Sequence, residues 1–266
     1  MNGWSWSPST PEPASEPAVA SLVGSIREAI VTVTGSSLVG LYLFGSLATG
    51  DFDAAVSDID LLAVLADTPS KRLVPRLRRM HADLAQTNPA WDDRIEVIYI
   101  STHGLATCRT HPTTIAVISQ GEPFHLVEAG RDWILNWYPA REHGVRLLGP
   151  PIDALIPPIP TAEYLEEVRR SLVGFTNRIP DDAPPGWQAY AILTMCRGLY
   201  ALRSGERLSK RVAAEWAQQE FPQWADLIGR ALGWRQHQHD PDGQDGAATV
   251  AETRAFVTEM AGLALA

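Results

Sequence analysis

The chain has 266 residues, which is enough for one large domain or two smaller ones with a substantial buried core. Its composition, 45% hydrophobic and 20% charged, is ordinary for a globular protein. The net charge of −9 disfavours nucleic acid as a partner and favours a cationic small molecule, because an acidic surface repels phosphates and attracts cations.

The sequence also argues against several cellular contexts. No run approaches the ~20 apolar residues that span a bilayer, and no basic stretch followed by an apolar one indicates a secretory signal. Two distant cysteines, Cys108 and Cys196, imply no disulfide framework and are too few for a structural zinc site. We therefore expect a monomeric, cytoplasmic protein without a membrane partner.

The first part of the chain predicts helices alternating with buried strands. Residues 1–17 are rich in proline and serine and are expected to form a disordered tail. The pattern beyond them predicts a mixed sheet with helices, forming one domain over residues 18–150. Its expected elements are a helix over 18–33, a strand over 38–44, a strand over 58–65, a helix over 69–85, a strand over 94–100, and mainly helix over 113–148.

The second part of the chain predicts helices alone. Five prolines within residues 149–160 cannot continue a helix and indicate a linker. Gly205 is typical of a helix end, Ser209 of a helix N-cap, and His237 and His239 of a polar loop. The expected class is α+β, with an all-α helical bundle over residues 160–266. Its helices are expected over 161–178, 187–204, 209–219, 222–236 and 247–264.

Two aspartates begin the second expected strand. Side chains alternate along a strand, so Asp58 and Asp60 share one face while Ile59 takes the other. Two carboxylates ~7 Å apart along a strand repel each other unless a cation lies between them. Mg²⁺ prefers oxygen ligands and keeps waters and substrate phosphates in its shell. The pattern therefore predicts a site for one or two Mg²⁺ ions.

Glu96 is the only acid in the apolar run of the third expected strand. If this strand neighbours the second one, Glu96 approaches the aspartate pair. It can then join them as a metal ligand, or take a proton from an acceptor hydroxyl as a general base. Both roles remain open at the level of the residues.

A glycine-containing turn follows the first expected strand. Gly45 lets the backbone turn sharply and approach a ligand, so the amide and hydroxyl of Ser46 can bind phosphate oxygens. Gly50 permits a second turn, and Ser57 stands directly before Asp58 as a further phosphate contact. This combination within a strand–turn–strand frame indicates a nucleoside triphosphate site, whose charge would be balanced by Mg²⁺ and a lysine.

These segments resemble the signature of the DNA polymerase β-like nucleotidyltransferases. Residues 35–264 as a whole resemble the streptomycin/spectinomycin adenylyltransferases among the aminoglycoside-modifying enzymes. The similar segments are LYLFGSLATG, SDIDLLAVL, RIEVIYI, REHGVRLLGP and AILTMCRGLYALRSGERLSKRVAAEWA.

The resemblance implies an enzyme that uses Mg²⁺ to transfer AMP from ATP to a hydroxyl of an aminoglycoside or aminocyclitol. It implies a nucleotidyltransferase domain followed by a helical bundle, with the active site in the cleft between them. It further implies that Asp58 and Asp60 bind Mg²⁺ and that Glu96 is the catalytic base. The other matching positions are Gly45, Ser46 and Ser57 at the phosphates, Asp132 at the nucleotide, and Lys210 as the lysine that reaches the phosphates.

The sequence departs from the family where the acceptor binds. The family's streptomycin pocket has a tryptophan soon after a Gly-Glu pair, whereas Pro123 follows that pair here. The acids expected before AILTMCRGLY are replaced by Trp187 and Gln188. Two alternatives therefore stand beside a small-molecule acceptor. The chain can be a toxin-like nucleotidyltransferase acting on a protein or tRNA, or a nucleotide-binding protein with little turnover.

Overall fold

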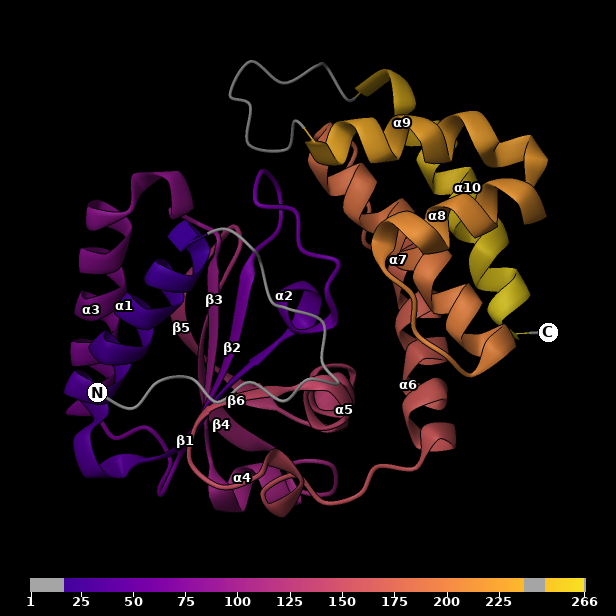
Figure 1. Cartoon of the computed structure of the whole chain (residues 1–266). Coiled ribbons are helices and arrows are strands. Elements are labelled where there is room, and N and C mark those ends of the chain that lie inside the picture. Colours follow the sequence, from indigo (N-terminus) through magenta and orange to yellow (C-terminus); the bar gives the residue numbers. More distant parts are fainter. Residues whose placement is uncertain (1–16, 237–246, 266) are drawn as a thin grey trace. The chain divides into compact units, whose positions relative to one another are not determined.

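The computed structural model describes residues 17–236 and 247–265 (Figure 1). The predicted tail, up to residue 16, and the predicted polar loop with His237 and His239 lie outside the described residues. The chain divides into two compact units, Met1–Pro158 and Ile159–Ala266. The division falls within the proline-rich segment 149–160.

The first unit is built on a six-stranded sheet in the order β5-β4-β3-β2-β1-β6. β2 and β3 pair in parallel, and every other neighbouring pair is antiparallel. The sheet is therefore mixed, as the sequence predicts. Its strands are β1 (Leu38–Phe44), β2 (Ile59–Leu65), β3 (Ile95–Ser101), β4 (Thr113–Ser119), β5 (Glu122–Ala129) and β6 (Val145–Leu148).

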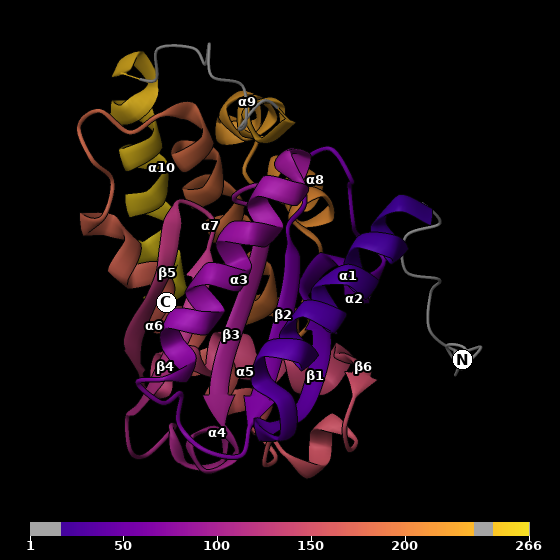
Figure 2. The ribbon, with the colours of Figure 1, turned by 90° about the vertical axis from the view of Figure 1, so that its left-hand side faces the viewer.

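Helices cover both faces of this sheet. α1 (Pro17–Thr34) and α3 (Leu73–Thr87) lie on one face (Figure 2), while α2 (Gly45–Thr49) and α5 (Ile134–His143) lie on the other (Figure 1). A shorter helix, α4 (Thr102–Thr107), follows β3. The α1/α3 face buries Leu61 of β2 and Val97 of β3 in the main core. Side chains alternate along strands, so Asp60 and Glu96 belong to the opposite face.

The expectation that no run is long and apolar enough to span a bilayer is not met by length and composition alone: within the described residues, one stretch, Ala18–Ser37, which contains most of α1, passes this test. The core helix of a globular protein meets the same criterion. Val23, Ile26 and Ile30 of α1 are buried in the main core together with α3 and the sheet. This packing covers one face of α1, and 33% of the apolar window is buried.

Residues 113–148 are largely strand, so the prediction of mainly helix in this segment is wrong. β4 and β5 form a hairpin, and α5 supplies the longer helix before β6. The β4 sequence TTIAVIS is rich in β-branched residues, which pack well on a pleated sheet. The three central residues of β4 are all buried, so the strand shows no simple alternation of apolar and polar positions.

The second unit, where described, consists of helices and short 3₁₀ turns (Figure 1). Two predicted boundaries are confirmed: Gly205 has a left-handed φ of 76° at the end of α7, and the Ser209 hydroxyl accepts a hydrogen bond from the Val212 amide. The helices are α6 (Thr161–Gly174), α7 (Pro185–Ser204), α8 (Lys210–Glu220), α9 (Ala225–Gln236) and α10 (Ala247–Leu265).

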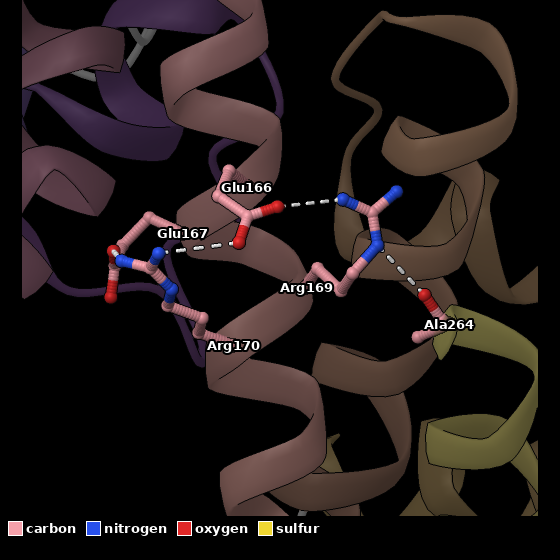
Figure 3. A network of polar contacts seen from close by, with 5 residues as sticks. All are labelled: Glu166, Glu167, Arg169, Arg170 and Ala264. Carbon is pink, nitrogen blue, oxygen red and sulfur yellow. Dashed lines mark hydrogen bonds and ion pairs between the residues drawn. The ribbon is translucent and has the colours of Figure 1, made fainter. Parts of the chain in front are cut away.

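A polar network joins α6 to the end of α10 (Figure 3). Arg169 donates from Nε to the carbonyl oxygen of Ala264 and from Nη1 to Glu166, both at 2.9 Å. Arg170 lies 3.3 Å from both Glu166 and Glu167. The last carbonyls of a helix have no intrahelical partner, so Arg169 satisfies one of them and fixes the end of α10.

Candidate active site

The topology of the first unit brings its acids and its glycine turn to one edge of the sheet. β1 ends where β2 and β3 begin, because Phe44 pairs with Asp60 and Asp60 pairs with Glu96. The β4–β5 turn reaches the same edge, since Ile118 of β4 pairs with Val97 of β3. The predicted residues at this edge are Gly45, Ser46, Ser57, Asp58, Asp60 and Glu96.

Asp60 and Glu96 lie side by side on neighbouring parallel strands. Paired strands run about 4.8 Å apart, and residues in register project from the same face. Both acids are half-buried, as is Asp58 just before β2. The second and third strands are therefore neighbours, which is the condition under which Glu96 approaches the aspartate pair.

The carboxylate of Asp60 packs directly against the backbone of Gly45. Gly45 has a φ of 68°, and a Cβ placed on it would meet Asp60 Oδ2 at 2.0 Å. Glycine is therefore required here for both its conformation and its size. Ser46 follows in α2, which ends at Thr49 and is capped by Gly50 with a φ of 75°, in line with the prediction of two tight turns.

Ser57 holds the turn that precedes Asp58. It is 3% exposed, and its hydroxyl accepts a hydrogen bond of 3.0 Å from the Asp53 amide. Asp53 Oδ1 in turn accepts from the Ala55 amide at 2.9 Å. These bonds give Ser57 a part in shaping the loop, while its contact with phosphate remains a prediction.

Arg94, which the sequence reasoning did not single out, clamps the same loop. It is 6% exposed and donates from Nη2 to the carbonyl oxygens of Ala54, at 2.8 Å, and Ser57, at 2.6 Å. Its guanidinium carbon lies 4.3 Å from the ring centroid of Trp91. Arg94 therefore ties the start of β3 to the segment that leads into β2.

Arg94 also places a positive charge near the acids. Burial lowers the pKa of Arg94, while the negative charges of Asp58 and Asp53 raise it. An arginine remains protonated in proteins, so its charge offsets part of the repulsion among the carboxylates. In the sequence, the feature that could have identified Arg94 is that a charged residue stands directly before an apolar strand.

The carboxylate of Glu96 is held by the β4–β5 turn. Glu96 Oε1 accepts a hydrogen bond of 3.0 Å from the backbone amide of Gln120. The next amide, of Gly121, donates to Asp93 Oδ1 at 2.7 Å. Neither Asp93 nor Gln120 was predicted to be a functional residue. The only local feature of the sequence that indicates this turn is the pair Gln120-Gly121.

The acids fit Mg²⁺ bound jointly with a phosphate ligand. Within the described part of the chain, no group of three or more His, Cys, Asp and Glu side chains could enclose a metal ion. Mg²⁺ commonly uses one or two carboxylates and completes its octahedral shell with water and phosphate oxygens. Asp60 and Glu96, with Asp58 directly upstream, supply such hard oxygen donors.

The two remaining predicted residues lie elsewhere. Asp132 is exposed in the turn Arg131–Trp133, which follows β5. β5 starts at the sheet edge that carries Glu96 and ends at the opposite edge. Lys210 is the first residue of α8 in the second unit, and its Nζ lies 5.9 Å from the ring centroid of Tyr190. The nucleotide roles of Asp132 and Lys210 therefore stay predictions.

The two parts of the chain match different family models. Residues 24–103 match the nucleotidyltransferase domain, and residues 154–260 match the C-terminal domain of aminoglycoside adenylyltransferases. A spectinomycin 9-adenylyltransferase of Staphylococcus aureus is 28% identical over 194 residues, which cover 69% of this chain and 72% of the relative. An aminoglycoside (3'') (9) adenylyltransferase of Escherichia coli is 33% identical over 86 residues, covering 31% and 30% respectively.

The fold is similar to that of a solved enzyme. The crystal structure of spectinomycin adenyltransferase AAD(9) from Enterococcus faecialis, with ATP and spectinomycin, superposes with a TM-score of 0.67 at 16% identity. The match covers 90% of this chain and 99% of that chain. The similarity of fold therefore includes the elements of both units.

Proposed function

We propose that the chain, whose two parts match the nucleotidyltransferase domain and the C-terminal domain of aminoglycoside adenylyltransferases, transfers AMP from ATP to a hydroxyl of a spectinomycin-type aminocyclitol. One observation carries the proposal more than any other. Asp60 and Glu96 are paired in register at the sheet edge where Gly45 and Ser46 follow β1. Nucleotidyl transfer needs acids that hold metal ions and a turn that binds phosphates, and both lie at this edge.

The phosphate end of ATP is assigned to the residues around the glycine turn. Asp58 and Asp60 would hold one or two Mg²⁺ ions, which supply charge neutralisation to the triphosphate when bound. The amide and hydroxyl of Ser46 would bind phosphate oxygens, with Gly45 keeping the backbone close to Asp60. Lys210 would offset further phosphate charge.

Glu96 is assigned the role of general base. As the acceptor oxygen forms a bond to the α-phosphorus, Glu96 takes the hydroxyl proton. The bond from the α-phosphorus to the bridging oxygen breaks, and pyrophosphate leaves with the electron pair. The hydrogen bond from the Gln120 amide holds the Glu96 carboxylate in place for this step.

Spectinomycin is the acceptor that the relatives favour. The S. aureus relative that matches 69% of this chain is named for spectinomycin, whereas the (3'') (9) enzyme of E. coli matches 31%. The net charge of −9 attracts the amines of an aminocyclitol. After the Gly-Glu pair this chain has Pro123, whereas the family's streptomycin pocket has a tryptophan soon after that pair. The absence of this tryptophan favours spectinomycin over streptomycin as the acceptor.

The proposal is tested by following α-phosphate-labelled ATP in the presence of Mg²⁺ and a panel of spectinomycin, streptomycin and other aminoglycosides. We expect label to move to spectinomycin and pyrophosphate to be released. Glu96→Gln and Asp60→Asn should each lower kcat by at least about 100-fold, because each removes a charged group acting in the transition state. Asp83→Asn, at an exposed acid of α3, is the matched control.

The assay also separates the alternatives. Label transferred to a protein or to tRNA in a lysate, with none on any drug, would contradict a small-molecule acceptor. Binding of ATP without pyrophosphate release under the whole panel would contradict the assignment of an enzymatic role to Glu96.

A further inference from the structure

The β4–β5 turn is joined to the candidate active site through its backbone. Two consecutive amides, of Gln120 and Gly121, donate to two carboxylates of the segment that opens β3, Glu96 and Asp93. Both donors belong to exposed residues, whose amides would otherwise bond to water. We propose that this turn is a positioning element for Glu96, in which the Gln120 amide orients the carboxylate and Asp93 holds the turn in register.

The turn is suited to this role because it is short and its strand is paired to β3. Ser119 of β4 pairs with Glu122 of β5 across the hairpin, and only Gln120 and Gly121 lie between them. β4 is itself paired to β3, with Ile118 opposite Val97. The amide that reaches Glu96 therefore moves with the strand that carries Glu96.

The geometry of the turn explains why the backbone, rather than a side chain, makes the contact. Gly121 has a φ of 72°, and Asp93 is the only non-glycine residue of the described chain with a positive φ. A positive φ at the second central residue and not at the first is compatible with a type II turn and excludes types I′ and II′. In such a turn the N–H of the first central residue is not used by the turn's own hydrogen bond, so the Gln120 amide is available to Glu96.

Asp93 is held in a conformation that most residues avoid. Its φ of 61° is left-handed, which aspartate tolerates better than most residues but which is rarely adopted without a reason. Its Oδ1 accepts the Gly121 amide at 2.7 Å. Asp93 is therefore a positioning residue that acts on Glu96 through the turn.

The inference rests on the proposed role of Glu96 as the base, and it is tested first without any activity. Amide hydrogen exchange is measured by NMR for Gln120 and Gly121 in the full chain. We expect both amides to exchange at least about tenfold more slowly than unprotected amides, since hydrogen bonds to charged groups are strong. Glu96→Ala should remove the protection of Gln120, and Asp93→Gly that of Gly121, about tenfold each.

The kinetic test uses a matched pair at one position. Gln120→Pro removes the N–H yet suits the first central position of a type II turn, and the extended Ser119 before it accepts a following proline. Gln120→Ala removes the side chain and keeps the N–H. We expect kcat of the proline variant to fall about tenfold below that of the alanine variant, with KM for ATP equal within about twofold.

A second pair tests Asp93. Glycine and asparagine both tolerate a positive φ, so neither substitution strains the backbone. Asp93→Gly removes the acceptor and should lower kcat in the same direction as Gln120→Pro, whereas Asp93→Asn retains an acceptor oxygen and should recover most of the loss. This pair decides the question if the proline variant does not fold.

Unprotected Gln120 and Gly121 amides in the wild-type chain, or equal kcat for folded Gln120→Pro and Gln120→Ala, would overturn the inference. A wild-type chain that transfers no label would overturn the proposed function alone. The exchange rates would then still show whether the turn holds Glu96.

Discussion

At the residue scale, the contact between Gly45 and Asp60 gives the sharpest prediction. Gly45→Ala introduces a Cβ that meets Asp60 Oδ2 at 2.0 Å, so the carboxylate has to move out of its place. The substitution also carries the cost of a left-handed alanine, about 1–2 kcal/mol. We expect transfer to fall at least about 100-fold and the Mg²⁺ concentration for half-maximal rate to rise, measured with labelled ATP.

A control separates the displaced carboxylate from the backbone strain. Gly35 has a left-handed φ of 55°, and a Cβ added there meets nothing within 4 Å. Gly35→Ala should therefore lower the free energy of unfolding by a similar strain term while leaving transfer intact. Equal loss of transfer in both variants would show that strain, and not the place of Asp60, explains the effect.

His81 makes the stability of the first unit depend on pH. It is 4% exposed, its Nε2 lies 2.8 Å from the Tyr99 hydroxyl, and burial lowers its pKa to about 4. The unfolded chain binds a proton near pH 6.5, whereas the folded chain does not. Stability should thus be fully present above pH 6.5 and decline as the pH falls toward 4, by at most about 3 kcal/mol.

Urea unfolding at pH 7.5 and pH 5 measures this decline. His81→Gln removes the titrating group, so the fall in the free energy of unfolding between the two pH values should be smaller than in the wild type. His111→Gln alters an exposed histidine and should keep the wild-type decline. An identical pH dependence in all three proteins would contradict the role assigned to His81.

The residues that carry the proposed chemistry were predictable from the sequence, and the residues that position them were not. Asp60 and Glu96 stand out because an acid in an apolar strand is costly without a function. Arg94 and Asp93 act through partners 28 to 40 positions away in the chain. Such contacts depend on strand register and on the β4–β5 turn, and no local pattern specifies them.

At the element scale, Arg94 couples β3 to the loop that leads into β2. Arg94→Lys keeps the positive charge but loses the two carbonyl contacts and the flat packing on Trp91. We expect the free energy of unfolding to fall by about 1–3 kcal/mol, because buried carbonyl oxygens lose a charged donor. The rate of AMP transfer should fall as well, since Asp58 is no longer fixed.

Arg79→Lys is the matched control for this prediction. The Arg79 side chain is 86% exposed, and its ion pair with Asp83 is an i,i+4 contact at 3.9 Å. A surface pair of this kind contributes little, so both stability and transfer should stay near wild type. Unfolding curves in urea and the labelled-ATP assay distinguish the two variants.

The helices of the second unit were easier to predict than the last strands of the first. Predicted and observed helices agree closely because Gly205 and Ser209 mark boundaries by local chemistry. Residues 113–129 were misassigned because Ala116 and its neighbours are buried in an inner strand, and a short buried run can be helix or strand by pattern alone. The β-branched residues and the Gln120-Gly121 turn were the discriminating signals.

At the scale of the whole molecule, the residues of the proposed site are divided between the two units. The acids and the glycine turn belong to Met1–Pro158, and Lys210 belongs to Ile159–Ala266. Lys210 occupies the first position of α8, where the positive end of the helix dipole disfavours a cation. A residue that costs stability at its own position is a candidate for a functional role.

Lys210→Ala is therefore expected to separate function from stability. Removing the cation relieves an unfavourable helix-dipole interaction of about 0.3–1 kcal/mol, so the second unit should unfold at an equal or slightly higher temperature. Transfer should nevertheless fall at least about tenfold, because less positive charge opposes the charge on the phosphates. Lys71, the only other lysine of the chain, is exposed in the first unit, and Lys71→Ala should change neither quantity. A stable Lys210→Ala protein with the full rate of transfer would remove the second unit from the phosphate chemistry.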